Sequence, residues 1–192
     1  QQQGNRQSGQ DRQQDRQHSS MTAGTTHDTK RGEDVRARQG VFSEHAEAWV
    51  ELVDALREAT AETRPALDGR TENLLWQMLV GTWTEHGPLA ADRLTRYLVK
   101  AAREAKDWTR WTGVNEKAED ELVAFAASLG EHPRVVELMT AWVERTAPTV
   151  RAATLGQTLL QLVTTGVADV YQGSETTRIA LVDPDNRGPV DH

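Results

Sequence analysis

The sequence predicts a mainly α-helical chain that forms part of a larger α/β fold. Apolar residues recur at helical spacing in segments spread from residue 33 to residue 163. Only two short stretches, residues 21–28 and 166–173, have the composition of strands. Two strands so far apart cannot form a stable sheet on their own, so we expect a helical excursion between two strands of a larger sheet.

The length and the first twenty residues limit what the chain can form alone. Its 192 residues suggest one domain or part of one, whereas a closed (β/α)8 barrel needs roughly 250 residues. Residues 1–20 contain eight Gln and no Ala, Val, Ile, Leu, Met or aromatic residue. Such a segment cannot bury enough apolar surface to offset the entropy of ordering it, so we predict that residues 1–20 are disordered.

Charge and cysteine content exclude several classes of function. The net charge is -7 and no basic stripe is present, so we expect no nucleic-acid partner. No apolar run reaches the roughly 20 residues that span a bilayer, so we expect no membrane partner. The absence of Cys excludes disulfides, thiolate catalysis and Cys-ligated zinc. The N-terminus lacks the apolar core of a signal peptide, which makes a cytoplasmic location the simplest interpretation.

The first part of the chain is expected to form a strand and three helices. Residues 21–28, MTAGTTHD, fit a short buried strand, and a helix is expected over residues 33–42. Ser43 is a plausible N-cap for the next helix, which Pro65 should end. Thr71 can cap the third helix.

Further helices are expected up to residue 163, where the helical spacing of apolar residues ends. Residues 89–106 predict a long amphipathic helix, and Asn115 can cap the next one. A helix that follows Pro133 should break at Pro148. Residues 155–163 are more uniformly apolar, so we expect that helix to be buried on more than one side.

The C-terminal segment predicts a strand and then a loop. The stretch GVADVYQG at residues 166–173 is apolar and bounded by Gly, which suits a buried strand. The stretch LVDPDNRGPVDH at residues 181–192 is rich in Pro, Asp, Asn and Gly, so it is expected to form a loop.

Four long stretches, in the same order, resemble one family. They are THDTKRGEDVRAR, YLVKAAREAK, GVADVYQGSE and LVDPDNRGPVD, which begin at residues 26, 97, 166 and 181. From about residue 21 to residue 192 the chain closely resembles the C-terminal part of the maltooligosyltrehalose synthases, mutases of the α-amylase superfamily. Residues 1–20 match nothing in that family.

The resemblance implies a domain organisation. Residues 21–42 would form the seventh strand of a (β/α)8 barrel and the helix that follows it. Residues 43–165 would form a helical insertion subdomain, and residues 166–192 would form the eighth strand and an active-site loop. The chain would then be a mainly α-helical fragment of a barrel enzyme, with the helical insertion between its last two strands.

The resemblance also implies a sugar site built from five residues. Asp28 would be the third catalytic carboxylate, which hydrogen-bonds sugar hydroxyls and stabilises the oxocarbenium-like transition state. His27 would contact the same glucosyl unit, and Lys30 would reach the sugar on the leaving side. Asp183 and Arg187 would lie near the reducing-end sugar. The resemblance implies neither a metal nor a cofactor.

The activity implied is the conversion of a terminal α-1,4 linkage of a malto-oligosaccharide into an α,α-1,1 linkage. The pathway partner would be maltooligosyltrehalose trehalohydrolase. Retaining glycoside chemistry needs a carboxylate nucleophile and a carboxylic acid roughly 5 Å apart. In the family both lie on strands upstream of the His-Asp pair, and those strands are not in this sequence. We therefore expect the chain to be inactive alone.

The sequence departs from the family pattern at several positions. Gly32 stands where the family has Ser, Ala168 where it usually has Pro, and Gly188 where it usually has Arg. The stretch TGVNEKAED lacks the Pro and Tyr of the family's usual loop NPNxxYE. The missing Arg at position 188 weakens the expectation of reducing-end contacts.

Other functions and other roles for these residues remain open at this point. Without the motif, His27 and Asp28 would be an ordinary strand-end pair, and Lys30 would belong to a solvated helix start. The Asp-rich DPDNR loop could suggest calcium, but no calcium-loop spacing is present, so we expect no metal. The rival functions are another α-glucan hydrolase of the superfamily and a non-enzymatic helical protein that binds a partner. The motif THDTKR and the long helical insertion favour the mutase.

The tryptophans divide into core and surface candidates. Trp49, Trp76 and Trp142 occur at helical spacing, so they are expected in the core. Trp108 and Trp111 lie in a predicted loop, where they could stack on sugars.

Overall fold

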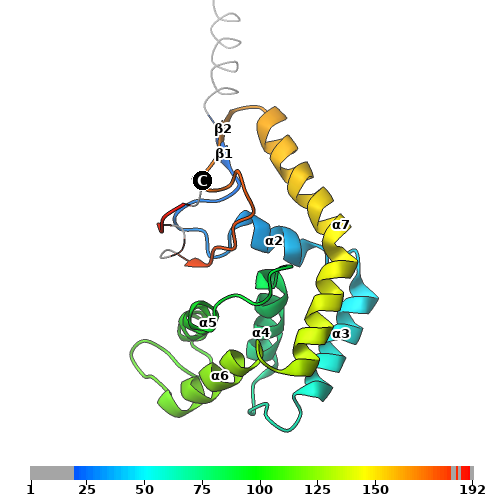
Figure 1. Ribbon diagram of the computed structural model, residues 1–192. Coiled ribbons are helices and arrows are strands. Elements are labelled where there is room, and N and C mark those ends of the chain that lie inside the picture. Colours follow the sequence, from blue (N-terminus) through cyan, green and yellow to red (C-terminus); the bar gives the residue numbers. More distant parts are fainter. Residues whose placement is uncertain (1–19, 183–184, 186, 191–192) are drawn as a thin grey trace, which may run out of the picture.

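The computed structural model describes residues 20–182, 185 and 187–190, which form six helices and two short strands (Figure 1). The strands are β1 (Met21–Ala23) and β2 (Val167–Asp169). The helices are α2 (Glu33–Gly40), α3 (Ala46–Ala59), α4 (Gly69–Thr82), α5 (Ala91–Ala105), α6 (Glu116–Ser128) and α7 (Pro133–Val163). The prediction of a mainly helical chain is confirmed. The disorder predicted for residues 1–20 lies outside the described residues, apart from Ser20.

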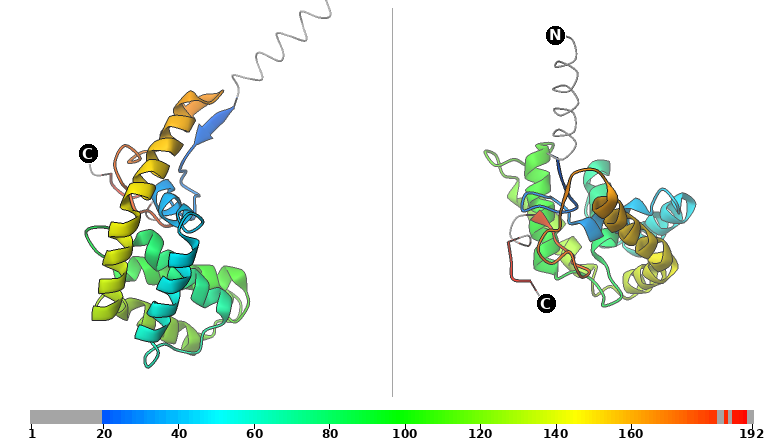
Figure 2. Two further views of the ribbon diagram at one scale, coloured as in Figure 1. Left: turned by 90° about the vertical axis from the view of Figure 1, so that its right-hand side faces the viewer. Right: turned by 90° about the horizontal axis from the view of Figure 1, so that it is seen from above.

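The helices pack around one apolar core. Helix α5 packs on α6, α3 packs beside α7, and α2 contacts both α4 and α7; the α3–α7 pair is seen clearly in Figure 2. Full burial of each large apolar side chain contributes about 1.5–3 kcal/mol. The largest buried side chains are Leu56, Leu75, Trp76, Met78, Trp83, Leu98, Leu122, Leu129 and Met139.

The aromatic residues of the core confirm two of the three predicted core tryptophans. Trp76 and Trp142 are buried, and Trp142 meets Trp49 edge-on with ring centroids 6.0 Å apart. Trp49 is half-buried and packs against the edge of the core, and its ring is stacked on Phe42 with centroids 4.1 Å apart.

The N-caps show which polar residues begin the helices. Asp68 Oδ1 accepts hydrogen bonds from the backbone N–H groups of Arg70 and Thr71 at 3.0 and 3.2 Å, so α4 begins earlier than predicted. The predicted Thr71 cap is wrong because a better acceptor precedes it by three residues. The Ser43 cap is also wrong, since its hydroxyl donates to the last carbonyl of α2 and α3 has no side-chain cap. The Asn115 cap of α6 is confirmed, with a 3.3 Å bond to the third residue of the helix.

Helix α7 runs unbroken through Pro148 over its 31 residues. The predicted break is wrong. Proline removes one backbone N–H and crowds the preceding turn. However, hydrogen bonds on both sides of Pro148 and the packing of the first half of α7 against α2 and α3 keep the helix continuous.

The C-terminal end of α7 exposes its apolar residues instead of burying them. These residues form what we call the apolar tail of α7, and they are 58–66% exposed: Leu155, Leu159, Leu160, Leu162 and Val163. The predicted burial is therefore wrong, because this part of α7 extends beyond the other helices towards β2 (Figure 1). Apolar composition predicts burial only where another element supplies the opposing surface. None of the helices in the described ranges is long and apolar enough to cross a membrane.

The two strands pair with each other in parallel, and Met21 lies opposite Val167. We expected them to need other strands, yet within the described residues they form a two-stranded sheet. Gln161 of α7 braces this sheet by donating to the carbonyls of Thr22 and Asp169 at 3.2 and 2.7 Å. The predicted burial of both strands is wrong, since Met21 and Val167 are 70% and 54% exposed.

Candidate functional site

Two loops from opposite ends of the described chain lie side by side. The first loop, residues 24–32, follows β1, and the second loop comprises the described residues from 178 to 190 (Figure 1). An antiparallel bridge pairs Arg31 with Leu181. The backbone hydrogen bonds on either side of it run from Gly32 N to Ala180 O at 2.9 Å and from Val182 N to Lys30 O at 3.1 Å. The structure therefore brings together the two motifs that the sequence singled out.

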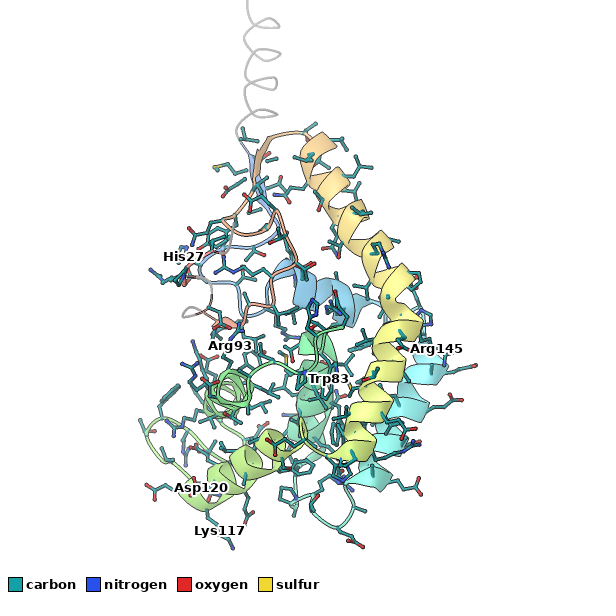
Figure 3. All side chains as sticks on the ribbon, in the orientation of Figure 1. His27, Trp83, Arg93, Lys117, Asp120 and Arg145 are labelled. Atoms are coloured by element: carbon teal, nitrogen blue, oxygen red, sulfur yellow. The ribbon has the colours of Figure 1, made fainter. Side chains whose placement is uncertain are left out.

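His27 and Asp28 occupy a tight turn in the first loop. Thr29 N donates to Thr26 O at 3.1 Å, and Thr26 N donates to the Thr29 hydroxyl at 2.8 Å, which closes the turn. His27 Nε2 lies 3.2 Å from Asp28 Oδ2, and the two side chains are 54% and 77% exposed. Figure 3 shows His27 at the outer edge of the loops, away from the helices. Both side chains are thus exposed to solvent.

Lys30 connects the first loop to the helices. Its Nζ donates to both carboxylate oxygens of Glu104, at 3.2 and 3.1 Å, near the end of α5. The two side chains are 54% and 42% exposed, so this ion pair lies at the surface. Surface pairs of this kind contribute only about 0–1 kcal/mol, which leaves Lys30 able to exchange its partner for a ligand at little cost.

The second loop is held by Asp185, which lies between the predicted site residues. Arg93 Nη2 of α5 donates to Asp185 Oδ2 at 2.8 Å, and Leu181 N donates to the same oxygen at 2.8 Å. Arg187 is exposed beside it, whereas Asp183 lies outside the described residues. Val182 has a φ of 54°, which is strained for a β-branched residue. The tight loop therefore stores backbone strain next to the predicted sugar contacts.

Two acidic residues at the start of α2 form hydrogen bonds with the loops. Asp34 is buried and Oδ2 accepts from Arg178 N at 2.7 Å, which attaches the second loop to α2. Burial raises the pKa of Asp34 above its usual value, despite the hydrogen bond from Arg178 and the nearby Arg38 charge. Burial likewise raises the pKa of Glu33, whose backbone N–H donates to the Thr25 hydroxyl at 3.0 Å.

A cavity of about 270 Å³ lies between the first loop and α7. Gly24, Glu33 and Gln161 are among its lining residues. A Cβ at Gly24 would lie 1.9 Å from Glu33 Oε2, so a larger residue there would require the Glu33 carboxylate to move. Its lining includes Thr22 and Ala23 of β1 and does not include His27 or Asp28.

The two loop tryptophans contact residues outside the site loops. Trp108 Nε1 donates to the Thr71 hydroxyl at 2.9 Å and its ring packs against the core, so its role is structural. Trp111 is 57% exposed, and the Arg103 guanidinium carbon lies 4.9 Å from its ring centroid. Of the two predicted sugar-stacking residues, Trp111 is exposed and Trp108 is half-buried.

The sequence did not indicate that Asp185, Glu33 and Asp34 hold the two loops in place. All three stand inside the quoted motifs, but a sequence does not show which charged side chain of a motif turns inward. Within the described ranges, no group of three or more His, Asp or Glu side chains could hold a metal ion.

Comparison with known proteins identifies the relatives of the chain. No family model matches it. A putative maltooligosyl trehalose synthase of Mycobacterium tuberculosis (strain ATCC 25618 / H37Rv) is 41% identical over 90% of this chain and 22% of its own length. The structure of maltooligosyltrehalose synthase from Arthrobacter ramosus matches with a TM-score of 0.83 and 39% identity, over 96% of this chain and 23% of that chain. A hypothetical maltooligosyl trehalose synthase of Sulfolobus tokodaii matches with a TM-score of 0.80 and 32% identity.

The sequence and structure comparisons agree on the same enzyme, and the fold of the described residues matches part of each solved structure. The chain spans about a fifth of the length of the relatives it matches, at 22% and 23%. Over 90% of its own length, the chain is therefore homologous to one segment of the maltooligosyltrehalose synthases.

Proposed function

We propose that this chain contributes part of the active site of a (1→4)-α-D-glucan 1-α-D-glucosylmutase. Such an isomerase converts the reducing-end α-1,4 linkage of a malto-oligosaccharide into an α,α-1,1 linkage. The observation that carries the proposal is the pairing of the first and second loops by backbone hydrogen bonds. This pairing gathers, from the two ends of the described chain, the motifs that resemble the sugar-binding residues of the family.

The proposal makes β1 and β2 the seventh and eighth strands of a (β/α)8 barrel. Residues 43–165 would then be a helical insertion, flanked by barrel segments at residues 21–42 and 166–192. Two features support this. The strands are parallel neighbours, and parallel neighbours require a crossover connection of the kind that α2 to α7 supply. The first loop follows the C-terminal end of β1, which is the end where barrel enzymes keep their catalytic residues.

In this proposal each of the five predicted residues has a role in the reaction. Asp28 stabilises the positive charge that develops on the glucosyl ring and accepts hydrogen bonds from its hydroxyls. His27 contacts the same ring. Lys30, Asp183 and Arg187 hold the released glucose while it turns and re-attacks through its anomeric hydroxyl. Matched donors and acceptors suit this holding task, and the reaction needs neither a metal nor a cofactor.

The chain alone is proposed to be catalytically incomplete. Retaining chemistry needs a nucleophile and an acid that face the scissile bond about 5 Å apart. Water must also be excluded from the site, because it would otherwise hydrolyse the intermediate. The Asp28 side chain is 77% exposed, which is incompatible with a site closed to water. The relatives carry much additional length that could supply both the missing carboxylates and the cover.

Complementation of a truncated relative tests the proposal. The purified chain is incubated with maltopentaose, alone and with the Arthrobacter ramosus enzyme from which the homologous segment has been deleted. With either protein alone, we expect the amount of reducing ends to stay constant. When both proteins are present, we expect loss of reducing ends without release of glucose. Asp28→Asn should abolish this activity, whereas Asp54→Asn, on the exposed face of α3, should leave it intact.

The other outcomes distinguish the rival functions. Activity of the chain alone would contradict its proposed incompleteness. Release of glucose or of new reducing ends would favour an α-glucan hydrolase, and no reaction in the mixture would favour a non-enzymatic helical protein. If the mutase activity is confirmed, the product would suit a hydrolase that releases trehalose, so maltooligosyltrehalose trehalohydrolase is the proposed pathway partner.

A further inference from the structure

Helix α5 contacts both loops of the candidate site through ion pairs. Glu104 receives Lys30 of the first loop at 3.1 Å, and Arg93 binds Asp185 of the second loop at 2.8 Å. Arg93 and Glu104 lie about three helical turns apart, so they share one face of α5. Figure 3 shows Arg93 between α5 and the second loop. One face of α5 thus touches both motif loops, although the family stretch that it carries, residues 97–106, contains no predicted sugar contact.

The two ion pairs differ in strength. The Lys30 pair is exposed on both sides, as described above. The Arg93 pair is less exposed, with side chains 31% and 14% accessible, and it is bidentate, with Nε to Oδ1 at 3.2 Å and Nη2 to Oδ2 at 2.8 Å. Two parallel charge-assisted bonds fix the orientation of both groups, and partial burial protects them from screening by salt. The Arg93 pair is therefore the one able to fix a loop.

Asp185 also organises the second loop internally. Its Oδ2 accepts from Leu181 N at 2.8 Å, and its backbone carbonyl accepts from the Arg178 guanidinium at 2.6 Å. Arg93 donates in addition to the carbonyl of Ile179. These bonds close the loop on itself and attach it to α5 at the residue midway between Asp183 and Arg187.

We propose that Arg93 and Asp185 are positioning residues that fix the second loop on α5, so that Arg187 meets the reducing-end sugar. This inference rests on the proposed function. In this proposal neither positioning residue touches the sugar; Asp185 acts by holding the loop that carries Arg187. The helical segment would then help to build the sugar site, and its α5 would set the geometry of the reducing-end contacts.

Hydrogen exchange of the full chain tests the attachment of the loop. Asp185→Asn keeps the shape of the side chain and an acceptor for Leu181 N, but removes the charge that binds Arg93. We expect amides of residues 178–190 to exchange about tenfold faster, while α4 and α6 are unchanged. The matched control is Asp92→Asn, which removes an exposed Asp–Arg pair on the same helix and should leave the loop unaffected. Unchanged loop exchange in Asp185→Asn would overturn the proposal.

Affinity for maltopentaose, titrated by NMR, tests whether Asp185 acts through Arg187. Asp185→Asn and Arg187→Ala should each weaken binding by about fivefold or more, and the double variant should bind no more weakly than Arg187→Ala. A purely structural role for Asp185 would not produce this non-additivity. Unchanged affinity in Asp185→Asn, or additive losses, would overturn the positioning role.

The two measurements separate this inference from the proposed function. If the unsubstituted chain binds no maltopentaose, the proposed sugar site fails, and the sugar-positioning role fails with it. The rate of hydrogen exchange at the amides of the second loop still shows whether Arg93 and Asp185 hold that loop. Faster loop exchange together with coupled loss of affinity supports both proposals.

Discussion

Glu119 joins α6 to α5 and to the loop between them through one buried carboxylate. Arg103 donates to its two oxygens at 2.9 and 2.6 Å, and the Thr109 hydroxyl donates to the first of them. The hydrogen bonds from Arg103 lower the pKa of Glu119, against the smaller opposing effect of burial. A carboxyl whose folded pKa is lowered stabilises the fold above its unfolded pKa, and that stabilisation is lost as the pH falls through the folded value.

Glu119→Gln should therefore lower the free energy of unfolding at neutral pH by about 1–3 kcal/mol, because charge-assisted hydrogen bonds are lost. The loss should shrink as the pH falls from the usual glutamate value of 4.5 through the lowered folded pKa, where the wild-type carboxyl also becomes protonated. Urea denaturation at several pH values measures both effects. Glu121→Gln on the same helix is the control, because Glu121 pairs with Lys117 only at 3.8 Å on the surface. Equal effects of the two substitutions would contradict this account.

Asp34 should show the opposite pH dependence. Burial raises its pKa, so the folded state binds a proton more readily than the unfolded state does. Its contribution to stability therefore falls as the pH rises from the usual aspartate value near 3.8 through the raised folded pKa. Asp34→Asn removes the buried charge and keeps an acceptor for Arg178 N. We expect a smaller loss of stability between pH 4.5 and pH 7 in this variant, measured by urea denaturation.

A second substitution at the same position separates charge from hydrogen bonding. Asp34→Ala leaves the Arg178 N–H without its partner, at a cost of about 1–3 kcal/mol for a buried donor. Asp34→Ala should therefore be less stable than Asp34→Asn at both pH values. An Asn variant with the pH profile of the wild type would show that Asp34 does not titrate as inferred.

At the scale of elements, α7 combines a buried half with an exposed half. Leu159 and Leu160 in the apolar tail are 60% and 61% exposed, whereas Leu122 in α6 is fully buried. An apolar helix face that lacks a covering element contributes little to stability, and it adds a surface prone to association. The N-terminal half of α7, packed on α2 and α3, carries the stabilising contacts of the helix.

Leu159→Gln should consequently change the free energy of unfolding by less than about 0.5 kcal/mol. Leu122→Ala should lower it by about 2–5 kcal/mol, because it leaves a cavity in the core. Chemical denaturation of the two variants measures the contrast. Light scattering should also show less self-association in Leu159→Gln. A large loss of stability in Leu159→Gln would mean that the apolar tail is covered in the isolated chain.

At the scale of the whole molecule, stability should be unevenly distributed. The helices share one core, whereas β1, β2 and the apolar tail of α7 are joined by few contacts beyond the strand pairing and Gln161. A two-stranded sheet without cover is marginal. Local opening should therefore be easier at the sheet than in the helices.

Hydrogen exchange of the unsubstituted chain measures this gradient. Amides of residues 21–23 and 159–169 should exchange much faster than those of α4 and α6, which open only with the core. Gln161→Ala should accelerate exchange in β1 and β2 and leave α4 unchanged, because only the brace across the sheet is removed. Uniform protection across the molecule would contradict a fold with one stable helical part and one weak sheet.

The candidate site was only partly predictable from the sequence. The motifs that carry His27, Asp28, Lys30 and Arg187 are long and local, so their order alone indicated a site. The inward turn of Asp185 and Asp34 was not predictable, because it depends on partners more than ninety residues away, Arg93 and Arg178. Local signals also misplaced two caps: Asp68 caps α4 three residues before Thr71, and the Ser43 hydroxyl donates to Gly40 O, so α3 has no side-chain cap.

The sequence by itself determined the helical composition, the Asn115 cap, most of the core and the family resemblance, because these depend on periodicity and contiguous motifs. Only the tertiary structure decided that α7 passes through Pro148, that the apolar tail and both strands are exposed, and that the two loops pair. Burial depends on which surface lies opposite a residue, and a single sequence carries no record of surfaces that another part of a fold must supply. For the same reason, the sequence did not indicate that α5 holds both loops. The ion pairs of Glu104 with Lys30 and of Arg93 with Asp185 depend on how distant segments pack.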